Sequence, residues 1–488
     1  MQERECHSPQ TRRRLKVLLT QPLIGARHIA APFKLSQRVN TFLYGQAMLA
    51  AVAREAGHEV FVLDPYFYKI SPEQYISYLK EHQFDVVGCS IYTLTFSLAK
   101  QLLEYTRAAL PNAITVAGGP HPTSLPAQTL NEIPLLDYII SGEGELAFVE
   151  LLDKIRTGAS VDSVKSLVYR RRRDQTPVIN PRREFVSDLD ELPIPAYDLF
   201  PIKEYVCTPN LVRRYPTVAT QITRGCPYQC AFCQYTLALG KHYRHRSPEK
   251  VIEELRFLKD RYGVRGVVFR DSTLTVDIPF LRSLCRSMID SGIDLAWMCY
   301  SRTDIIAKHG MEILPLMKKA GCWQIGYGCE SANQKTLDLL NKGTTVQHNI
   351  DAVQRTIRNG IMCSTTWMLG LPGETKDDAW ESVRLAIKLS PHLAKFFLPI
   401  PYPGTDLEQM CREDGGLREN APYDDYEFFQ PEHPVYVNPL IGKEGMLKLL
   451  KRAYRRFYTT PRILSRNLLQ CKDWDMIKKY WHFARLLF

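Results

Sequence analysis

The sequence predicts an α/β protein made of two successive domains and a helical, basic tail. Short apolar runs alternate with stretches of helical spacing, first over residues 15–155 and again over residues 217–406. The first alternation predicts an N-terminal doubly wound parallel sheet of the Rossmann-like type. The second predicts a partial (βα)6 barrel of the TIM type, because only six strand–helix units can be counted. The hydrophobic content of 45% is ordinary for a globular chain.

Five strands are expected in the first domain, after a loose end at residues 1–14. Helices of the expected spacing separate them, including one over Thr41–Gly57 and one over Ser97–Ala109. In a sheet of this kind, ligands bind at the carboxyl ends of the strands. The expected strands are Leu15–Thr20, His58–Leu63, Phe84–Ile91, Ile114–Ala117 and Tyr138–Ser141.

Residues 156–216 break this alternation and are rich in Arg, Pro and Asp, which predicts an ordered linker. The barrel follows over 217–406, and a helical region over 407–488. Six units are fewer than the eight of a closed barrel, so the sheet should remain open. Its expected strands are Val218–Thr223, Gly266–Phe269, Leu295–Ser301, Trp323–Gly328, Met362–Leu369 and Lys395–Ile400.

The net charge of +11 is concentrated near the C-terminus, where residues 445–488 carry a net charge of +9. Such a tail suits an anionic cofactor, a membrane surface or nucleic acid, or simply forms a solvated helical face. The apolar runs are too short to cross a bilayer, and the first residues lack the apolar core of a secretion signal. A cytoplasmic protein is expected, in which most of the 13 cysteines are reduced thiols.

Three of the cysteines form a cluster, Cys226, Cys230 and Cys233, directly after the first expected barrel strand. Their C-x3-C-x2-C spacing on one tight loop lets three thiolates bind three corners of a cubic iron–sulfur cluster. A structural zinc site usually needs four ligands in two pairs, and no second C-x2-C pair is present. His242 and His245 lie close behind and leave zinc as the alternative.

The loop Thr223–Cys233, with an aromatic residue before its third cysteine, resembles the radical S-adenosylmethionine superfamily. The resemblance implies that Cys226, Cys230 and Cys233 bind a [4Fe–4S] cluster whose open iron coordinates S-adenosylmethionine. One electron would then cleave the sulfonium to a 5′-deoxyadenosyl radical that abstracts hydrogen from the substrate. In this family the aromatic position lies near the adenine, and Phe232 occupies it.

Polar residues also follow the later barrel strands, where the family binds S-adenosylmethionine. Asp271 ends the second strand, Arg302 the third, and Glu330 and Ser331 the fourth. A bound amino acid with a ribose needs a cation for its carboxylate and acids for its amine and hydroxyls. We therefore expect these four side chains to contact S-adenosylmethionine, although Asp271 and Arg302 would also fit plain ion pairs at strand ends.

The first domain resembles the cobalamin-binding domain that precedes many radical S-adenosylmethionine cores. The resemblance rests on Gly-Gly-Pro-His and Ser-Gly-Glu-Gly-Glu after the fourth and fifth strands, and on Ser90 after the third. No histidine has Asp two residues before it, so an Asp-x-His-x-x-Gly ligand to cobalt is lacking. His28 and His121 are read as loop or surface residues. The cobalamin contacts expected from the resemblance are Ser90, Gly118, Gly119, Gly142, Glu143 and Gly144.

The C-terminal region, including Pro401–Thr405 and Ala453–Tyr458, resembles the subgroup with the anaerobic Mg-protoporphyrin ester cyclase and hopanoid-modifying enzymes. This implies a radical enzyme that uses cobalamin, most simply to methylate an unactivated carbon. Radical oxidative cyclisation or rearrangement of a tetrapyrrole- or lipid-like substrate is the alternative.

A tRNA methylthiotransferase would carry a second three-cysteine cluster in its leading domain. A non-catalytic cobalamin or cluster sensor would bind without cleaving S-adenosylmethionine.

Four expectations about partners follow from this resemblance. The substrate is expected to be a small molecule, and the resemblance to the subgroup favours an apolar one. A flavodoxin or ferredoxin is expected to supply the electron. Nucleic acid is not expected as a partner, and the basic tail allows a peripheral contact with a membrane.

Overall fold

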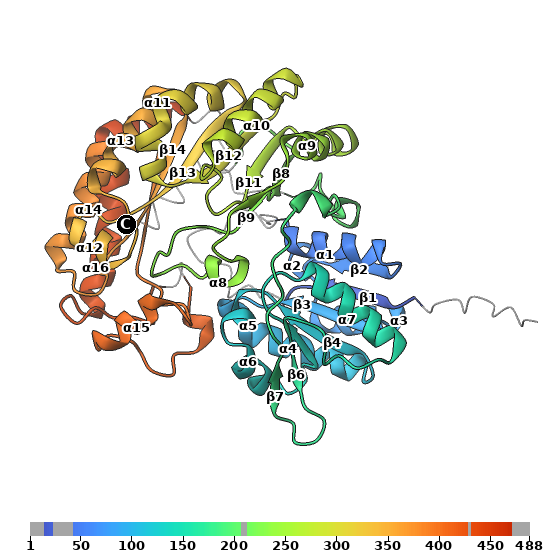
Figure 1. Ribbon diagram of the computed structural model, residues 1–488. Coiled ribbons are helices and arrows are strands. Elements are labelled where there is room, and N and C mark those ends of the chain that lie inside the picture. The colour runs from blue at the N-terminus through green and yellow to red at the C-terminus, as the bar shows by residue number, and fades with distance from the viewer. Residues whose placement is uncertain (1–13, 23–41, 206–211, 428–430, 471–488) are drawn as a thin grey trace, which may run out of the picture.

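The computed structural model describes residues 14–22, 42–205, 212–427 and 431–470. Arg14 is the one residue of the expected loose end that the structure describes. The rest of that end, His28 and residues 471–488 lie outside the described residues. Figure 1 shows two α/β units next to each other, a twisted sheet (blue to cyan) and a strongly curved sheet (green to orange). The prediction of two successive α/β domains is confirmed.

The N-terminal sheet has the order β2-β1-β3-β4-β5-β6-β7, and its first five strands in that order are parallel. The chain reverses direction across the sheet at β1, which pairs with both β2 and β3, as in doubly wound folds. The parallel strands are β1 (Lys16–Thr20), β2 (Glu59–Leu63), β3 (Val86–Ser90), β4 (Ile114–Gly118) and β5 (Tyr138–Ile140). The helices are α1 (Tyr44–Glu55), α2 (Pro65–Tyr68), α3 (Pro72–His82), α4 (Phe96–Ala109), α5 (Pro120–Ser124), α6 (Pro126–Glu132) and α7 (Glu145–Thr157).

The stretch 156–216, expected to be a linker, adds two strands to this sheet. β6 (Leu167–Arg170) and β7 (Pro177–Ile179) form an antiparallel hairpin at its edge. Leu167 and Val168 are fully buried and join the core, while the charged residues 171–174 form the turn. The charge density that suggested a linker therefore belongs to a hairpin turn, and the flanking strands are too short to give a clear alternation.

The second sheet contains six parallel strands in the order β15-β14-β13-β12-β11-β8, which confirms the open six-stranded barrel. Its strands are β8 (Thr217–Thr220), β11 (Gly266–Phe269), β12 (Ala296–Ser301), β13 (Cys322–Glu330), β14 (Met362–Met368) and β15 (Leu393–Phe397). The outer face is covered by α9 (Pro248–Tyr262), α10 (Ile278–Asp290), α11 (Thr303–Lys319), α13 (Val346–Arg358) and α14 (Lys376–Leu389) (Figure 1). The short α12 (Gln334–Leu339) follows β13.

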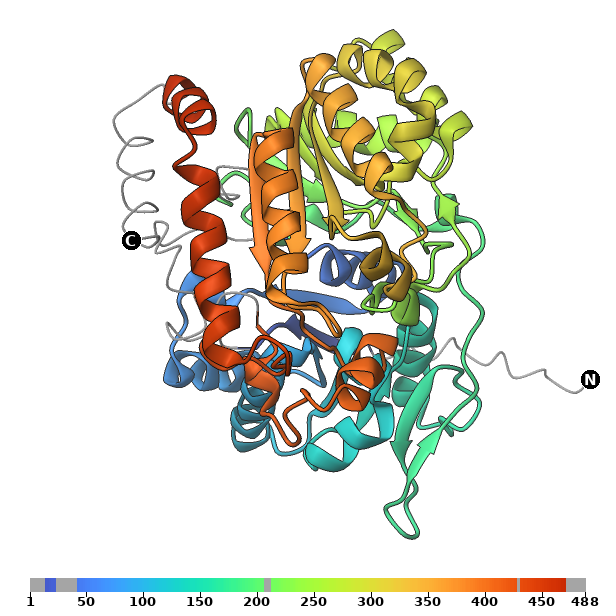
Figure 2. The same ribbon diagram turned by 90° about the vertical axis from the view of Figure 1, so that its left-hand side faces the viewer.

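The C-terminal helices α15 (Asp406–Glu413), α16 (Lys443–Tyr458) and α17 (Pro461–Gln470) follow the barrel. Figure 2 shows α16 running along the last strands of the barrel. The Tyr454 hydroxyl donates to the Phe396 carbonyl over 3.0 Å, and the Phe457 ring packs on the Phe396 ring. The basic residues of α16 at positions 451, 452, 455 and 456 are exposed, so this part of the basic tail is the solvated face of an amphipathic helix.

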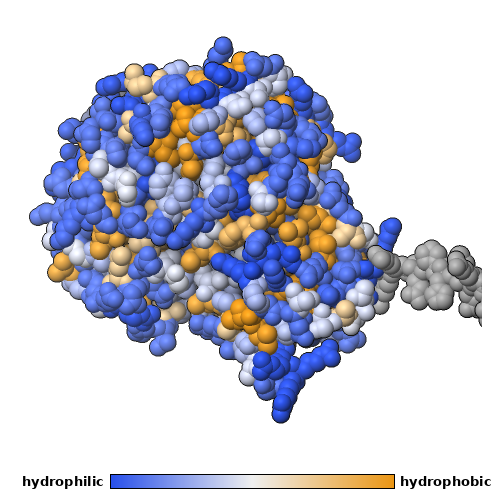
Figure 3. All heavy atoms as spheres, in the orientation of Figure 1, coloured by the Kyte–Doolittle hydropathy of each residue, from blue (hydrophilic) through white to orange (hydrophobic). Residues whose placement is uncertain are grey.

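The face of the molecule seen in Figure 3 is mostly hydrophilic, with apolar residues gathered in scattered patches. Within the described ranges, no helix combines the length and the apolar character that a bilayer crossing requires.

Candidate functional site

The loops at the carboxyl ends of the two sheets meet between the domains. The Tyr44 hydroxyl at the start of α1 donates to the Gln221 carbonyl over 2.8 Å. The Gln234 amide reaches Ser124 of the first domain at 3.5 Å and the Pro403 carbonyl at 3.1 Å. Ligand sites in both fold types lie at these strand ends, so the interface brings two such sites together.

The three cysteines lie on the loop between β9 (Thr223–Arg224) and α8 (Tyr235–Leu239). Cys226 is buried, Cys230 and Cys233 are half-buried, and all three are free thiols. The loop is fixed by the Cys226 amide donating to Gly240 and the Cys233 amide donating to Cys230. Among the described residues, no three His, Cys, Asp or Glu side chains gather closely enough to hold a single metal ion. A cubic cluster does not require this, because each thiolate binds a different iron.

Arg302, at the end of β12, brings a positive charge to this loop. Its guanidinium lies 3.5 Å from the Tyr228 ring centroid and 3.5 Å from the Cys230 sulfur. Asp304 accepts from its Nε over 3.0 Å, and the Lys342 carbonyl accepts from its Nη2. The Arg302 guanidinium therefore stacks on the Tyr228 ring and donates to the Cys230 sulfur.

Glu330 and Ser331 lie at the end of β13, as the sequence predicts. Glu330 has a φ of +61°, which is unusual for a residue other than glycine, and its carboxylate accepts from Lys342 Nζ over 2.9 Å. The Lys342 ammonium also lies 5.3 Å from the Phe232 ring centroid. Burial acts to lower the pKa of Lys342, but the charge and hydrogen bond of Glu330, together with the neighbouring Cys230, raise it overall. The Ser331 hydroxyl donates to Glu374 over 3.2 Å.

Asp271 follows β11 and is 1% exposed. Its Oδ1 accepts from the backbone amides of Ile222 and Thr223, which lead into the cysteine loop, over 3.0 and 2.5 Å. Burial raises the pKa of Asp271 to about 6, although these hydrogen bonds oppose the shift. Within the described residues, Oδ2 has no hydrogen-bond partner. Asp271 thus positions the cysteine loop with one oxygen.

The glycines expected to contact cobalamin lie at the ends of β4 and β5. Gly119 has a φ of +104°, and a Cβ there would lie 2.9 Å from the Ile91 carbonyl oxygen. Gly142 has a φ of +94°, and its amide donates to the Thr123 hydroxyl over 3.0 Å. A cavity of about 290 Å³ opens beside them. Residues lining it include Thr123, Ser124, Ser141, Val168, Ile179, Asn180, Arg182, Leu237 and Gly404.

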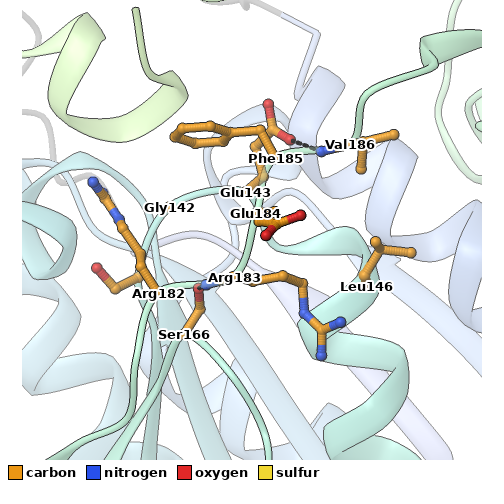
Figure 4. A pocket seen from close by; sticks show the side chains of 10 residues that line it. Gly142, Glu143, Leu146, Ser166, Arg182, Arg183, Glu184, Phe185 and Val186 are labelled. Carbon is orange, nitrogen blue, oxygen red and sulfur yellow. Dashed lines mark hydrogen bonds between the residues drawn. The ribbon is translucent and has the colours of Figure 1, made fainter. Parts of the chain in front are cut away.

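The other expected contacts with cobalamin are Ser90, Gly118, Gly144 and Glu143. Ser90 and Gly118 end neighbouring strands, and Gly144 precedes α7. The Glu143 carboxylate, in contrast, accepts from Arg244 over 2.7 Å and from the Val186 amide over 3.1 Å, as the dashed line in Figure 4 marks. The surrounding pocket in Figure 4 is lined by Ser141, Gly142, Leu146, Ser166 and residues 182–186.

Glu143 belongs to a buried ion-pair network that joins the two domains. Glu145, two residues further along, accepts from Arg224 over 2.5 Å, and Arg224 lies 3.7 Å from Glu143. Arg244 is the fourth member of the network, and all four side chains are at most 7% exposed. Burial opposes ionisation of Glu145, but Arg224 outweighs this and lowers its pKa. Since Arg224 is two residues from Cys226, the network connects the glycine loop of the first domain with the cysteine loop.

We expect Arg244→Met to lower the free energy of unfolding by about 3–5 kcal/mol, because it leaves the buried Glu143 carboxylate without its close partner. The matched control is Arg54→Met, which breaks the Arg54–Asp198 pair, whose side chains are 38% and 51% exposed. That change should cost less than about 1 kcal/mol. Urea unfolding of both variants measures the difference, and equal losses would contradict a structural role for the network.

The structure therefore places Arg302 beside Cys230. It also places Lys342 beside both Phe232 and Glu330. Sequence reasoning missed Lys342, Arg224 and Arg244. Lys342 lies in a polar turn, Asn341-Lys342-Gly343, that carries no signal of its own. Arg224 and Arg244 flank the cysteines, and two arginines so close to a predicted cluster could have been noted as partners for Glu143 and Glu145.

Two family models match this chain. Residues 41–152 match the B12 binding domain, and residues 220–386 match the Radical SAM superfamily. The chain is 30% identical over 427 residues to an uncharacterized methyltransferase of Pyrococcus horikoshii, which covers 87% of this chain and 90% of that protein. It is 28% identical to the anaerobic magnesium-protoporphyrin IX monomethyl ester cyclase of Rubrivivax gelatinosus, over 88% of this chain and 75% of that protein.

A solved structure has the same arrangement of domains. The radical S-adenosylmethionine methyltransferase TsrM from Kitasatospora setae, with cobalamin and a [4Fe-4S] cluster bound, superposes with a TM-score of 0.70. The match covers 90% of this chain and 91% of that one at 18% sequence identity. A similarity at this identity establishes the fold.

Proposed function

Because this chain belongs to the radical S-adenosylmethionine enzymes with a B12-binding domain, we propose that it methylates an unactivated carbon of a small molecule. The family supplies the cofactors, which are a [4Fe–4S] cluster, S-adenosylmethionine and cobalamin. When bound, these groups supply the electron, the adenosyl radical and a carrier for the methyl group. The observation that carries the proposal is the meeting of the cysteine loop with the glycine loops of the first domain at one interface.

We propose that Cys226, Cys230 and Cys233 hold the cluster. Free thiols on a loop braced by Asp271 from one side and by Arg302 from the other support this role. The rest of the barrel core, residues 217–406, then holds S-adenosylmethionine. Arg302 would bind its carboxylate, Phe232 would lie against the adenine, and the free oxygen of Asp271 would accept from a donor of the ligand.

Glu330 and Ser331 are proposed to complete this pocket. The Glu330–Lys342 pair places one negative and one positive group at the end of β13, which suits the amine and the carboxylate of an amino acid. The φ of +61° at Glu330 supports a binding role, because strained conformations of non-glycine residues cluster at functional sites.

Cobalamin is proposed to bind the domain of residues 15–155 at the carboxyl ends of β3, β4 and β5. Ser90, Gly118, Gly119, Gly142 and Gly144 border this edge, and the cavity of about 290 Å³ beside Gly142 supports the binding of part of the cofactor. Its hydroxyl-rich lining suits a ligand with amide and phosphate groups. Glu143 would contribute indirectly, by holding the loop against Arg244.

Radical oxidative cyclisation is the second candidate, favoured by the similarity to the magnesium-protoporphyrin ester cyclase. The two reactions leave different products from S-adenosylmethionine. Methyl transfer to cobalamin leaves S-adenosylhomocysteine, whereas radical formation leaves 5′-deoxyadenosine and methionine.

We further propose a cytoplasmic location and a flavodoxin or ferredoxin as electron donor, since the cluster must be reduced for each radical formed.

The test is an anaerobic incubation of the full chain with reconstituted cluster, reductant and S-adenosylmethionine, with and without cobalamin. We expect S-adenosylhomocysteine to form only when cobalamin is present. Formation of 5′-deoxyadenosine alone, unchanged by cobalamin, would contradict methylation and favour the cyclase reaction. Liquid chromatography with mass spectrometry distinguishes the two nucleosides.

A further inference from the structure

Two positively charged side chains point into the curved sheet of the barrel, away from its helices. On β15, Phe396 packs outward against Phe457 of α16, so its neighbour Lys395 points to the inner face. On β11, Phe269 pairs with Thr220, whose hydroxyl contacts Glu254 of the outer helix α9, so Phe269 faces outward and Arg270, the next residue, points inward. The two strands lie near opposite edges of the sheet, and the curvature of the open barrel turns these edges toward each other (Figure 1).

The inner face near these residues is accessible to solvent. Along β15 the burial alternates, with Leu393, Lys395 and Phe397 half-buried and the outward residues buried. The inward-pointing Thr366 on the neighbouring β14 pairs with Lys395 in the sheet and is also half-buried. Since the outer face is covered by helices, water reaches these side chains from inside the barrel.

Neither cation has an anionic partner among the described residues. No hydrogen bond or ion pair involves the Lys395 ammonium or the Arg270 guanidinium, and Arg270 Nε is buried without an acceptor. Burial and the charge of Arg270 both lower the pKa of Lys395. At the interface, Arg224, Arg244 and Lys342 are each paired with a carboxylate. Two cations on one inner face with no carboxylate beside them give that face a positive potential, which favours the binding of an anion.

Tyr92 follows β3 at the carboxyl edge of the first sheet, and its side chain is 56% exposed. Lys395 lies on β15 and Arg270 directly after β11, so both belong to the inner face of the barrel. The position is separate from Arg302 and Lys342, which lie beside Cys230 and Phe232.

We propose that Arg270 and Lys395 bind an anionic group of the substrate, a carboxylate or a phosphate. The proposal rests on the proposed function, because it assumes that the barrel interior between the two cofactors receives a substrate. It narrows the substrate class to molecules that carry such a group. A purely apolar substrate, which the sequence suggested, would leave both cations unpaired.

Competitive labelling of lysines with acetic anhydride tests this proposal. Full-length protein is loaded with cluster, cobalamin and S-adenosylmethionine without reductant, so that the cofactor sites are filled and no turnover occurs. Acetylation of Lys395 is followed by mass spectrometry with inorganic phosphate or benzoate as probes. We expect at least one probe to slow acetylation about tenfold at saturation, since a bound anion that raises the pKa of an amine by about one unit has this effect. The exposed Lys388 on α14 serves as the internal control.

Arg270→Gln should raise the half-protecting concentration of the probe about tenfold, because it removes a charge-assisted hydrogen bond. The exposed Arg286→Gln on α10 is the matched control and should leave this concentration unchanged. Protection by phosphate alone identifies a phosphate, and protection by benzoate alone identifies a carboxylate. No protection, equal protection of Lys388, or protection unchanged in Arg270→Gln would overturn the proposal. Because the readout needs no turnover, its failure is distinguishable from a failure of methyl transfer.

Discussion

Replacing Cys230 by alanine should abolish formation of 5′-deoxyadenosine and leave the protein without an intact iron–sulfur cluster. In the proposed cluster site, the three thiolates of this loop are the protein ligands, and Cys230 is the middle one. Its sulfur also accepts the contact from Arg302 at 3.5 Å, so the substitution removes both an iron ligand and the partner of that cation. We expect the activity to fall by more than about 1,000-fold, because cleavage of the sulfonium depends on an electron from the cluster.

The matched control for this variant is Cys411→Ala. Cys411 is fully buried in α15 and lies outside the cysteine loop, so its loss should change stability slightly and leave the iron content intact. Iron and sulfide assays and the yield of 5′-deoxyadenosine compare the two proteins. Full activity in Cys230→Ala would show that this cysteine is not a ligand.

Gly225→Ala should have nearly as large an effect while leaving all three cysteines in place. Gly225 has a φ of +80°, and a Cβ at this position would lie 1.9 Å from the His242 carbonyl oxygen. The backbone strain and the clash with another backbone atom together cost on the order of 3–5 kcal/mol. The loop must therefore shift, and Cys226, the next residue, moves with it. Affinity for the cluster should fall by about 100-fold or more, since each 1.4 kcal/mol corresponds to a factor of ten.

Gly263→Ala separates this clash from the effect of a positive φ alone. Gly263 has a φ of +68°, but a Cβ there meets nothing within 4 Å. Its substitution should cost about 1 kcal/mol and leave cluster binding unchanged. If Gly225→Ala retains iron as well as Gly263→Ala does, then the loop geometry around Cys226 is not required for cluster binding.

The architecture was predictable from sequence because parallel sheets produce strong local signals. Strands buried on both faces appear as continuous apolar runs such as Val86–Ser90, and helices between them repeat at regular intervals. The cysteine loop was predictable for a similar reason, since its ligands lie within eight residues of one another. Both features depend on neighbours in the sequence.

Features that depend on distant residues were harder to predict. The strands β6 and β7 are short, and a charged turn masks them, so residues 156–216 looked like a linker. The pairing of Glu143 with Arg244 joins residues that are 101 positions apart. Lys395 on β15 and Arg270 after β11 are separated by three strands in the sheet, and only its curvature turns them toward each other. No spacing in the sequence reports such contacts.

The most direct test of the central claim, that one chain holds both the cluster and cobalamin, is a metal analysis of the full-length protein. The protein is reconstituted anaerobically with iron and sulfide, supplied with cobalamin, and freed of unbound cofactors. We predict about four irons and four sulfides per chain, together with about one cobalt. A protein that retains zinc alone, with neither iron nor cobalt, would contradict the claim.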